Sequence, residues 1–593
     1  MFKNAFFRLD KFRRLAFSLD SVDSVNTISD KRTPFVLFGS TIIFYVLYLL
    51  VMQPNWVTGG EMWAEMATNY FQNANSPSYF AKLFSTDAGY IPLVPRLIAF
   101  IGNFLSLPAA SIPYFYTWTA VLLTSLLVGV FCLPIFRKVI NNDFFRFYIV
   151  IGILIVADFD TSTFINFTYF ASFFASIITA LVLVQDKSDN IPAWTWFLPL
   201  LIISKPALLG VIPMMVFASF FSNIRFRRIV FFSVSLSILQ LFQLLVSNQN
   251  QVFPHAESNN LTFVGKIFLT MKYFFELLGK YVTGPLVSDF FYNKLRISLY
   301  FKIAFGVIVF FLIFLFLKTI RKRSNSLIIV GMCLLYFNIL LNCFSLVWGE
   351  KMEILNGVPI YRQIMPGFIG SILIVAGVAE NLKYIYFVSK INVFSKIFSP
   401  HYLFVGWFVL AGWLTLGVHL SREPKFPLLG LSQWQKFSPA IDDLPDLSLC
   451  FPINPNGWLY TRGKGAAVLP DGYVCGAEFK YNDTNDEKGK FILKVKPPTT
   501  VKKLKITSLG IVIRALNSDV NVLKVKAIVK SLNGTTKLLF GEINMDNSEN
   551  LIHLTTNSTI GIENVNSVEF IFNTSTKFAY INNQPAIMWM GYE

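Results

Sequence analysis

Charged residues, histidine and cysteine are scarce in this sequence. Asp, Glu, Lys and Arg make up 14% of its 593 residues, against about 25% of a typical soluble chain, which excludes an ordinary soluble enzyme. The four histidines and five cysteines are scattered, without CxxC or metal-ligand spacing, so a histidine-based metal centre is not expected. The sequence also contains no Gly-rich phosphate loop and no Rossmann-like βαβ pattern, which excludes the usual nucleotide-binding folds.

Apolar residues are abundant instead and predict a polytopic α-helical membrane protein. Hydrophobic residues make up 54% of the chain, 63 residues are Phe, and the mean hydropathy is +0.54. Runs of a length that crosses a bilayer predict about eleven spans. The predicted spans are residues 34–52, 111–136, 145–158, 168–184, 192–204, 206–222, 229–247, 297–317, 327–347, 366–380 and 402–419.

The charges that are present indicate how these spans are oriented. Residues 1–420 carry 32 basic and 18 acidic residues, whereas residues 421–593 carry 19 and 16. Short loops rich in Lys and Arg, such as 225–228 and 318–323, are expected on the cytoplasmic side. The N-terminus is therefore predicted inside and, after an odd number of spans, the C-terminus outside. The basic excess accompanies the membrane part, which favours the lipid bilayer over nucleic acid as a partner.

Residues 1–33 predict a cytoplasmic segment and not a cleavable signal, because they lack an uninterrupted apolar core. Phe2 and Phe6, with Lys11 and Arg13 nearby, are typical of an amphipathic helix lying on the bilayer. A solvated basic tail that satisfies the positive-inside rule explains the same residues. Both interpretations place the segment inside.

The transmembrane region, residues 34–420, departs from a plain bundle in two ways. Residues 192–222 contain four prolines that divide two short apolar runs, and broken helices at membrane depth need cover from protein or a water-filled cavity. Residues 53–110 and 248–296 are long outer segments with stretches that predict helices on the membrane surface. The working face is therefore predicted to be the outer one.

Residues 421–593 predict an extracytoplasmic β-sandwich or jelly-roll domain. Apolar residues alternate with lysines, as in 522–530, which indicates half-buried strands. Six to eight short strands separated by turn signals favour an antiparallel sandwich. Cys450 and Cys475 both lie in this domain, where an oxidising compartment allows a disulfide between them, which we predict; unpaired thiols are the alternative.

The most informative acidic residues follow the first predicted span. Glu61 and Glu65 are four residues apart, so on a helix they share one face, and such a pair suits a general base. Gly60 immediately before Glu61 permits a tight turn that favours Glu61. The alternative is a pair of solvated loop acids, against which the apolar neighbours in 61–71 argue.

Other charged residues are predicted near the outer membrane surface. Asp87 and Arg96 flank a Gly/Pro-shaped turn, where they line a cavity or pair with each other to stabilise the loop. Lys205 and Arg362 could bind a fixed anion such as a lipid phosphate or extend to the headgroups. The remaining acids at this level are Asp158 and Asp160, which end the third span and face a polar cavity in this interpretation.

These features together resemble the GT-C superfamily of integral membrane glycosyltransferases. The resemblance lies in the topology, the broken spans and the outer β-domain, and in the stretches EMWAEMATNYF at 61–71 and DAGYIPLVPR at 87–96. It is nearest to bacterial enzymes that decorate O-antigen or other surface glycans with sugars carried on undecaprenyl phosphate. Many members carry an Asp or an Asp-Glu pair where this chain has two glutamates, so the choice between Glu61 and Glu65 stays open.

The resemblance implies a polyprenyl-phosphate-linked sugar donor, a glycan acceptor and a site on the periplasmic face of the bacterial inner membrane. A carboxylate (Glu61, Glu65 or Asp87) would deprotonate an acceptor hydroxyl that attacks the anomeric carbon as lipid phosphate departs. Lys205, Arg362 and Arg96 would hold the phosphate. No cofactor follows from the sequence. A requirement for a divalent metal stays open, although no clear set of ligands is apparent.

Two other classes compete with this interpretation. A transporter or lipid flippase commonly has paired broken helices in two repeated halves, whereas only one such pair, at 192–222, is apparent here. A membrane acyltransferase would favour a catalytic histidine near a span, and neither His401 nor His419 has a persuasive polar partner in the sequence.

Overall fold

The structure is a computed structural model, and the chain divides into two compact units. One comprises residues 1–54, 83–97 and 117–423, and the other comprises residues 55–82, 98–116 and 424–593. We call them the helical unit and the mixed unit. The residues described are 10–11, 13–14, 17, 32–87, 90–157, 159–247, 262–287, 300, 304, 307–308, 311–313, 315, 317, 322–348, 361–382, 405–407, 410, 434–435, 438, 441–442, 449–454, 458–462, 483–485, 491–495, 505–515, 522–544, 549–556, 561–573, 578–579 and 586–592.

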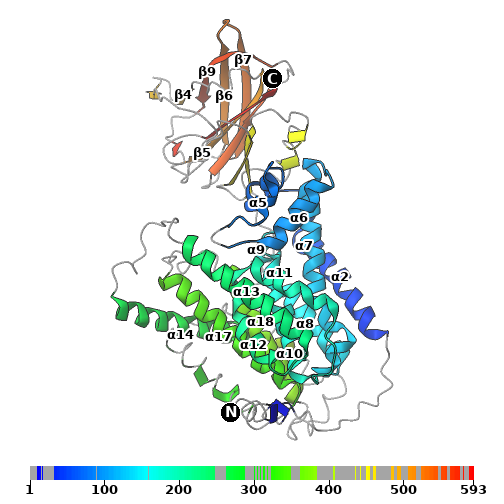
Figure 1. Ribbon diagram of the computed structural model, residues 1–593. Helices are drawn as coiled ribbons and strands as arrows, with labels where there is room; N and C mark the ends of the chain where they lie inside the picture. Colours follow the sequence, from blue (N-terminus) through cyan, green and yellow to red (C-terminus); the bar gives the residue numbers. More distant parts are fainter. Residues whose placement is uncertain are drawn as a thin grey trace, which may run out of the picture. The chain divides into compact units, whose positions relative to one another are not determined.

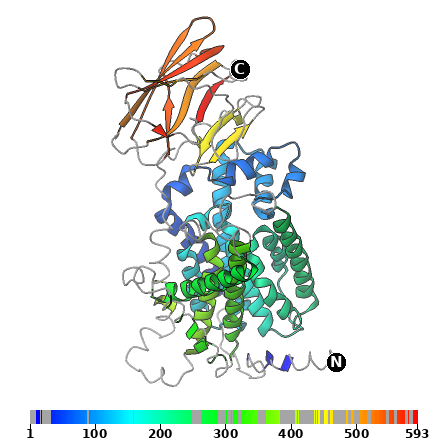
Figure 2. The ribbon, with the colours of Figure 1, turned by 90° about the vertical axis from the view of Figure 1, so that its left-hand side faces the viewer.

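The helical unit is built from apolar helices joined by short 3-10 turns (Figure 1 and Figure 2). Its helices are α2 (Thr33–Met52), α8 (Asp143–Val156), α9 (Phe159–Ser162), α10 (Ala171–Val184), α11 (Phe197–Ser204), α12 (Ile212–Ser219), α13 (Ile224–Ser247), α14 (Phe263–Val287), α17 (Asn325–Trp348) and α18 (Tyr361–Leu382). Two further helices, α6 (Leu93–Phe104) and α7 (Ile112–Gly129), contribute residues to both units.

Four helical segments in the described part of the chain are long and apolar enough to cross a membrane. They are Thr33–Met52, Ala109–Cys132, Phe167–Val184 and Asn325–Cys343, and each coincides with a predicted span. Shorter apolar helices lie at Ala193–Ser204, Pro206–Ser219 and Met365–Asn381, also within predicted spans. Most of the predicted spans 297–317 and 402–419 lies outside the described residues, so the number of spans and their direction stay predictions.

The buried centre of the helical unit is α10, whose residues are all buried. Beside it, α17 and α18 approach closely through glycines. A β-carbon on Gly331 would lie 2.6 Å from the carbonyl oxygen of Gly370, and one on Gly370 would lie 2.8 Å from that of Gly331. Small residues of this kind let helix backbones pack directly in a membrane.

Arg13 occupies a position that neither interpretation of the N-terminal segment anticipated. Its side chain is 2% exposed, and its guanidinium donates to the carbonyl oxygens of Leu183 at 3.1 Å and Gln185 at 2.9 Å. Asp10 pairs with it at 3.0 Å. These carbonyls end α10, where a cation satisfies otherwise unpaired acceptors and offsets the helix dipole. Arg13 therefore fastens the N-terminal segment to the helical unit.

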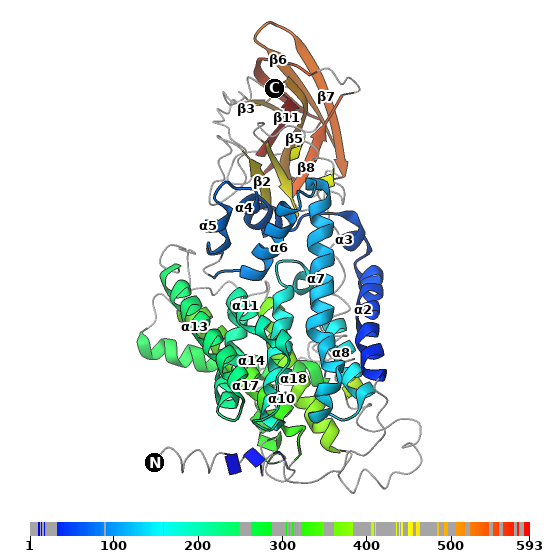
Figure 3. The ribbon, with the colours of Figure 1, turned by 45° about the vertical axis from the view of Figure 1, so that its right-hand side comes forward.

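The mixed unit contains three sets of antiparallel strands within its described residues (Figure 3). The first is the hairpin of β1 (Leu449–Ile453) and β2 (Trp458–Arg462). A four-stranded sheet has the order β10-β5-β11 with β8 also paired to β5, and a five-stranded sheet has the order β3-β4-β9-β6-β7. The other strands are β3 (Asp483–Asn485), β4 (Phe491–Val495), β5 (Lys505–Ala515), β6 (Val522–Ser531), β7 (Thr536–Asn544), β8 (Glu549–Leu554), β9 (Val565–Phe572), β10 (Phe578–Ala579) and β11 (Ala586–Tyr592).

Alternation along β6 explains how these sheets form a core. Leu523, Val525, Ala527 and Val529 are buried, while the lysines between them face outward. The neighbouring strand β9 buries Val565, Val568, Phe570 and Phe572 on the same side. One face of the five-stranded sheet is thus apolar and covered, as expected for an antiparallel sheet with one solvated face. The antiparallel strands predicted for 421–593 are present, but the described residues hold eleven strands where six to eight were predicted, and the sandwich or jelly roll stays a prediction.

Candidate functional site

Lys205 lies at a break in the helical unit. The helix α11 ends at Ser204, Lys205 is extended with φ −152° and ψ 124°, and a 3-10 turn begins at Pro206. A residue before proline is disfavoured in the helical region, which is why α11 ends here. The predicted division of 192–222 into two short helices therefore occurs, and the only charged side chain at the break is that of Lys205.

The ammonium group of Lys205 is held by neutral oxygens and aromatic rings. Its side chain is 4% exposed, and Nζ donates to Tyr90 Oη at 2.8 Å, Asn166 Oδ1 at 2.9 Å and the Ile165 carbonyl at 3.3 Å. The rings of Tyr90 and Tyr169 each lie 5.0 Å from Nζ, within the range of cation–π attraction. An ammonium has three protons, so these contacts fix its position.

Asn166 connects Lys205 to the backbone of Asp160 in the short helix α9. Its Nδ2 donates to the Asp160 carbonyl at 3.1 Å while its Oδ1 accepts from Lys205. Thr163 also donates to the Asp160 carbonyl, at 2.7 Å. The Asp160 side chain is half-buried. Predicted cavity acid Asp160 and predicted phosphate ligand Lys205 are thus brought into one hydrogen-bonded cluster through Asn166.

The stretch 85–97 joins the same cluster from a distant part of the chain. Asp87 and Tyr90 exchange backbone hydrogen bonds of 2.7 and 3.0 Å, which form the predicted turn. The Val94 amide donates to Ser204 Oγ at 2.9 Å, next to Lys205. Arg96 is 4% exposed and donates to Ser85 Oγ. The structure therefore brings together three of the regions singled out in the sequence.

Three residues of this cluster were not predicted from the sequence. Tyr90 lies inside the DAGYIPLVPR stretch, where the sequence signal is in the charged residues Asp87 and Arg96. Asn166 and Tyr169 lie in an apolar run with no signal of their own. Their roles depend on contacts between residues up to 115 positions apart, which single-sequence patterns do not report.

Chemically, the cluster combines a buried cation with the hydroxyl of a half-buried tyrosine. Because the Tyr90 oxygen accepts from a cationic donor, the phenolic O–H is directed away from Lys205 and is a stronger hydrogen-bond donor. Tyr90 is half-buried, whereas Lys205 is buried.

The predicted helical pairing of Glu61 and Glu65 in the mixed unit is wrong. Gly60 has φ +67° and Ala64 has φ +47°, conformations that interrupt any helix between them. The π-helical turn η1 (Met66–Phe71) begins only after Glu65. Gly60 adopts the left-handed conformation that favours glycine, and a β-carbon there would lie 2.5 Å from Tyr114 Cζ.

Glu61 and Glu65 occupy different surroundings. Glu61 is 1% exposed, and its Oε2 accepts from the Trp434 backbone amide at 3.4 Å. Trp434 is itself fixed, since its indole donates to the Ala109 carbonyl at 2.8 Å. Glu65 is half-buried at the start of η1. Glu61 is therefore buried against Trp434, whereas Glu65 is half-buried as a residue, with its Oε2 atom buried.

Several predicted site residues lie outside what the structure describes. These are Asp158, Cys475 and the side chains of Arg362 and Cys450, so their predicted roles and the predicted disulfide are untested. Within the described residues, no group of three or more His, Cys, Asp or Glu side chains could hold a metal ion. The cysteines Cys132, Cys333 and Cys343 are free thiols in helical segments.

Comparisons with known proteins add one similarity. No protein-family model and no curated protein matches the chain. Among solved structures, it is similar to the crystal structure of the oligosaccharyltransferase of Archaeoglobus fulgidus in complex with Zn and sulfate. The match covers 91% of this chain and 98% of that chain, at 8% identity and a TM-score of 0.27. A similarity at this level carries no argument, so the assignment below rests on this chain's own residues.

Proposed function

We propose that this protein is a membrane glycosyltransferase that moves a sugar from a polyprenyl-phosphate donor to a hydroxyl of a glycan. The observation that carries the proposal is the 2.8 Å hydrogen bond from the buried Lys205 ammonium to the half-buried Tyr90, at a helix break in an apolar helical unit. A phosphate attached to a membrane lipid is an anion that can reach such a site from the bilayer. No nucleotide is required, consistent with a sequence that lacks a Gly-rich phosphate loop.

The site would act mainly on the leaving group. As the bond between the anomeric carbon and the phosphate oxygen breaks, its electron pair and the negative charge stay on the phosphate. Tyr90 would donate to that oxygen, and Lys205 would stabilise the charge in low-dielectric surroundings, where such contacts are stronger. Arg96 and Arg362 are assigned to the other phosphate oxygens.

The acceptor hydroxyl needs a base to take its proton. We assign this role to Glu65, because it is half-buried and directly precedes a π-helical turn, a feature frequent at functional sites. Glu61 is then a positioning residue that fixes the loop through the Trp434 amide. Asp87 and Asp160 are the carboxylates that would replace Glu65 if its substitution left transfer intact.

The identity of donor and acceptor is taken from the resemblance of the 61–71 and 87–96 stretches. On that basis the donor is an undecaprenyl-phosphate sugar and the acceptor an O-antigen-like surface glycan. The protein would then lie in the bacterial inner membrane with its site on the periplasmic face. With the predicted topology, in which the N-terminus is inside and the C-terminus outside, the donor must reach Tyr90 and Lys205 from the periplasmic side.

The test is an assay of the purified chain in lipid nanodiscs with synthetic polyprenyl-phosphate glucose, galactose or N-acetylglucosamine and a polysaccharide acceptor. We expect release of polyprenyl phosphate coupled to sugar in the acceptor, with both slowed in Tyr90→Phe and in Glu65→Gln. Movement of a fluorescent lipid-linked sugar across liposomes, without transfer, would instead identify a flippase. An acyl group appearing on the glycan would identify an acyltransferase.

A further inference from the structure

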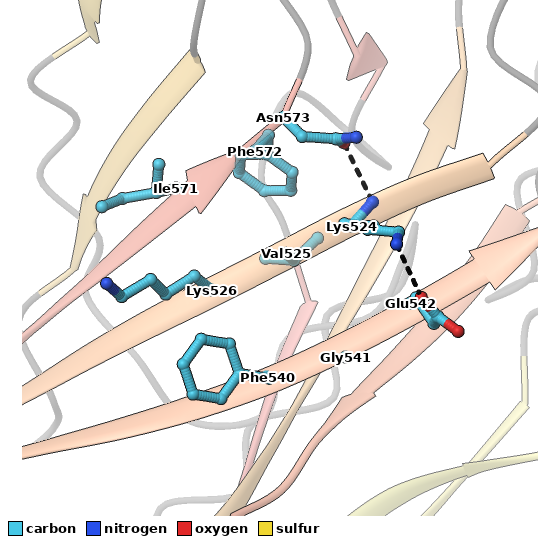
Figure 4. Close-up of a pocket in the computed structure, with 9 residues that line it drawn as sticks. All are labelled: Lys524, Val525, Lys526, Phe540, Gly541, Glu542, Ile571, Phe572 and Asn573. Atoms are coloured by element: carbon cyan, nitrogen blue, oxygen red, sulfur yellow. Dashed lines mark hydrogen bonds and ion pairs between the residues drawn. The ribbon is translucent and has the colours of Figure 1, made fainter.

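A hollow of about 380 Å³ lies on the outward face of the five-stranded sheet. It is lined by Lys524, Val525, Lys526, Phe540, Gly541, Glu542, Ile571, Phe572 and Asn573 (Figure 4). We propose that this hollow binds a saccharide carrying an anionic group.

The strand register builds the hollow from two rows of outward side chains. Phe540 on β7 and Ile571 on β9 stand directly opposite Lys526 on β6. Two residues along, Glu542 stands opposite Lys524. Side chains on one face of a strand recur every second residue, or about 7 Å apart. The backbone of Val525 lies between the rows, so the space between them is open to a ring-shaped ligand.

The apolar wall of the hollow is presented to solvent. Phe540 is 55% exposed, so its ring is available to a ligand at the surface of the sheet. Its backbone exchanges hydrogen bonds of 2.8 and 3.0 Å with Thr555, in addition to its pairing with β6. The ring is therefore displayed from a fixed backbone. The C–H face of a sugar ring packs against such an aromatic face at little entropic cost.

The polar wall offers groups that match sugar hydroxyls. Two hydrogen bonds fix Asn573. Its side-chain Oδ1 accepts from the Lys524 backbone amide at 2.9 Å, and its backbone amide donates to the Lys524 carbonyl at 3.2 Å. Its side-chain NH₂ then remains as a donor, and the Glu542 carboxylate is an acceptor. Few polar groups beside an apolar wall are typical of small-molecule sites.

The charge of the lining selects an anionic sugar. Lys524 lies 3.4 Å from Glu542, so these two charges offset each other. Lys526 lies over the Phe540 ring at 5.9 Å, and within the lining only Glu542 is acidic against two lysines. The hollow therefore carries a net positive charge beside its aromatic face. A carboxylate or phosphate on the sugar would meet Lys526.

In the proposed glycosyltransferase this site would hold the acceptor glycan, and that role rests on the proposed function. Binding of an anionic saccharide to the hollow does not depend on the proposed function. The binding test uses the full chain in nanodiscs and isothermal titration with trigalacturonic acid, with neutral galactotriose as the comparison. We expect the acidic trisaccharide to bind at least tenfold more tightly than the neutral one. Phe540→Ala and Lys526→Gln should each weaken its binding about tenfold.

The matched control is Lys530→Gln, on the same strand and face but outside the hollow, where Lys530 lies 3.6 Å from Glu569. Its binding should equal that of the unsubstituted chain. Equal affinity for both trisaccharides, or equal loss in Lys530→Gln, would overturn the proposal, as would an absence of binding to either. Transfer to a small soluble hydroxyl acceptor reports the proposed function separately, because it should persist in Phe540→Ala.

Discussion

The Lys205 ammonium donates a 2.8 Å hydrogen bond to the phenolic oxygen of Tyr90, which lies 115 residues earlier in the chain. This bond joins the break after α11 to the turn formed by Asp87 and Tyr90. It fixes a buried positive charge against the hydroxyl of a half-buried tyrosine. The pair is the part of the molecule on which the proposed donor site depends.

Removal of the Tyr90 hydroxyl should weaken use of the lipid-phosphate donor. A hydrogen bond to a charged group is worth about 1.5–3 kcal/mol, so Tyr90→Phe should lower kcat/KM for the donor about ten- to a hundredfold. Lys205→Met should cost at least as much. The acceptor KM should stay unchanged in steady-state assays with purified protein.

Tyr48→Phe is the matched control, because the Tyr48 hydroxyl donates to the Ile155 carbonyl at 2.9 Å and takes no part in the Lys205 cluster. Its kinetics should equal those of the unsubstituted chain. Unchanged donor dependence in Tyr90→Phe would remove the Lys205 cluster from the donor site.

Substitution of Glu65 and of Glu61 by glutamine should affect turnover to different extents. Glu65→Gln removes the proton acceptor but keeps the shape, so turnover should fall by roughly 10²–10⁴-fold, the usual contribution of a general base. Glu61→Gln keeps an oxygen for the Trp434 amide and should retain more than a tenth of the rate. Donor binding and thermal stability should persist in both, as checked by titration and melting.

The opposite result is equally informative. If Glu61→Gln alone abolished turnover, Glu61 would be the base despite its burial. If both variants stayed active, Asp87 or Asp160 would become the base candidate, and each should then be changed to Asn in the same assay.

The glycine contact between α17 and α18 should be sensitive to one added methyl group. Because a β-carbon on Gly370 would lie 2.8 Å from the Gly331 carbonyl oxygen, Gly370→Ala should cost about 1–3 kcal/mol, as overpacking does. Gly39→Ala on α2 is the control, since no atom lies within 4 Å of a β-carbon there. Thermal unfolding in nanodiscs should show a lower midpoint for Gly370→Ala only; equal midpoints would argue against the close approach.

Asp143 should make the stability of the helical unit depend on acid pH. Burial alone would raise the pKa of Asp143, but hydrogen bonds and charges from Arg137 and Arg146 outweigh it and lower that pKa below its usual value. The stabilisation is therefore complete above the ordinary Asp pKa of about 4 and is lost as pH falls through the lowered folded-state value.

Asp143→Asn should abolish this dependence and destabilise the protein at neutral pH. Arg146 has no exposed side-chain surface and pairs with Asp143, and breaking a buried pair costs about 3–5 kcal/mol. The carbonyl oxygens of Phe131 and Cys132 also accept from Arg146 and would still do so in the variant. We therefore expect a loss of stability near the lower end of that range. Melting midpoints measured from pH 7 to pH 3 should converge for the two proteins at the acid end.

Local patterns in the sequence were sufficient for the elements but not for the site. Apolar run length predicted α2 and α10, and period-two alternation predicted β6, because both depend on neighbouring residues and the bilayer or core that they face. The same local reasoning was wrong for Glu61 and Glu65. Spacing alone implied a shared helix face, whereas the close packing of Tyr114 against Gly60 and the conformation of Ala64 exclude one.

By itself, the sequence determined that this is an apolar, helix-rich chain with a β-rich C-terminal part, and it marked Lys205 as the charge beside a proline. Only the tertiary structure decided what surrounds that charge. Tyr90, Asn166 and Tyr169 reach Lys205 from segments that no periodicity connects. Burying an ammonium is costly unless it gains hydrogen bonds, so the fold must bring those acceptors to it, and that requirement acts between distant residues.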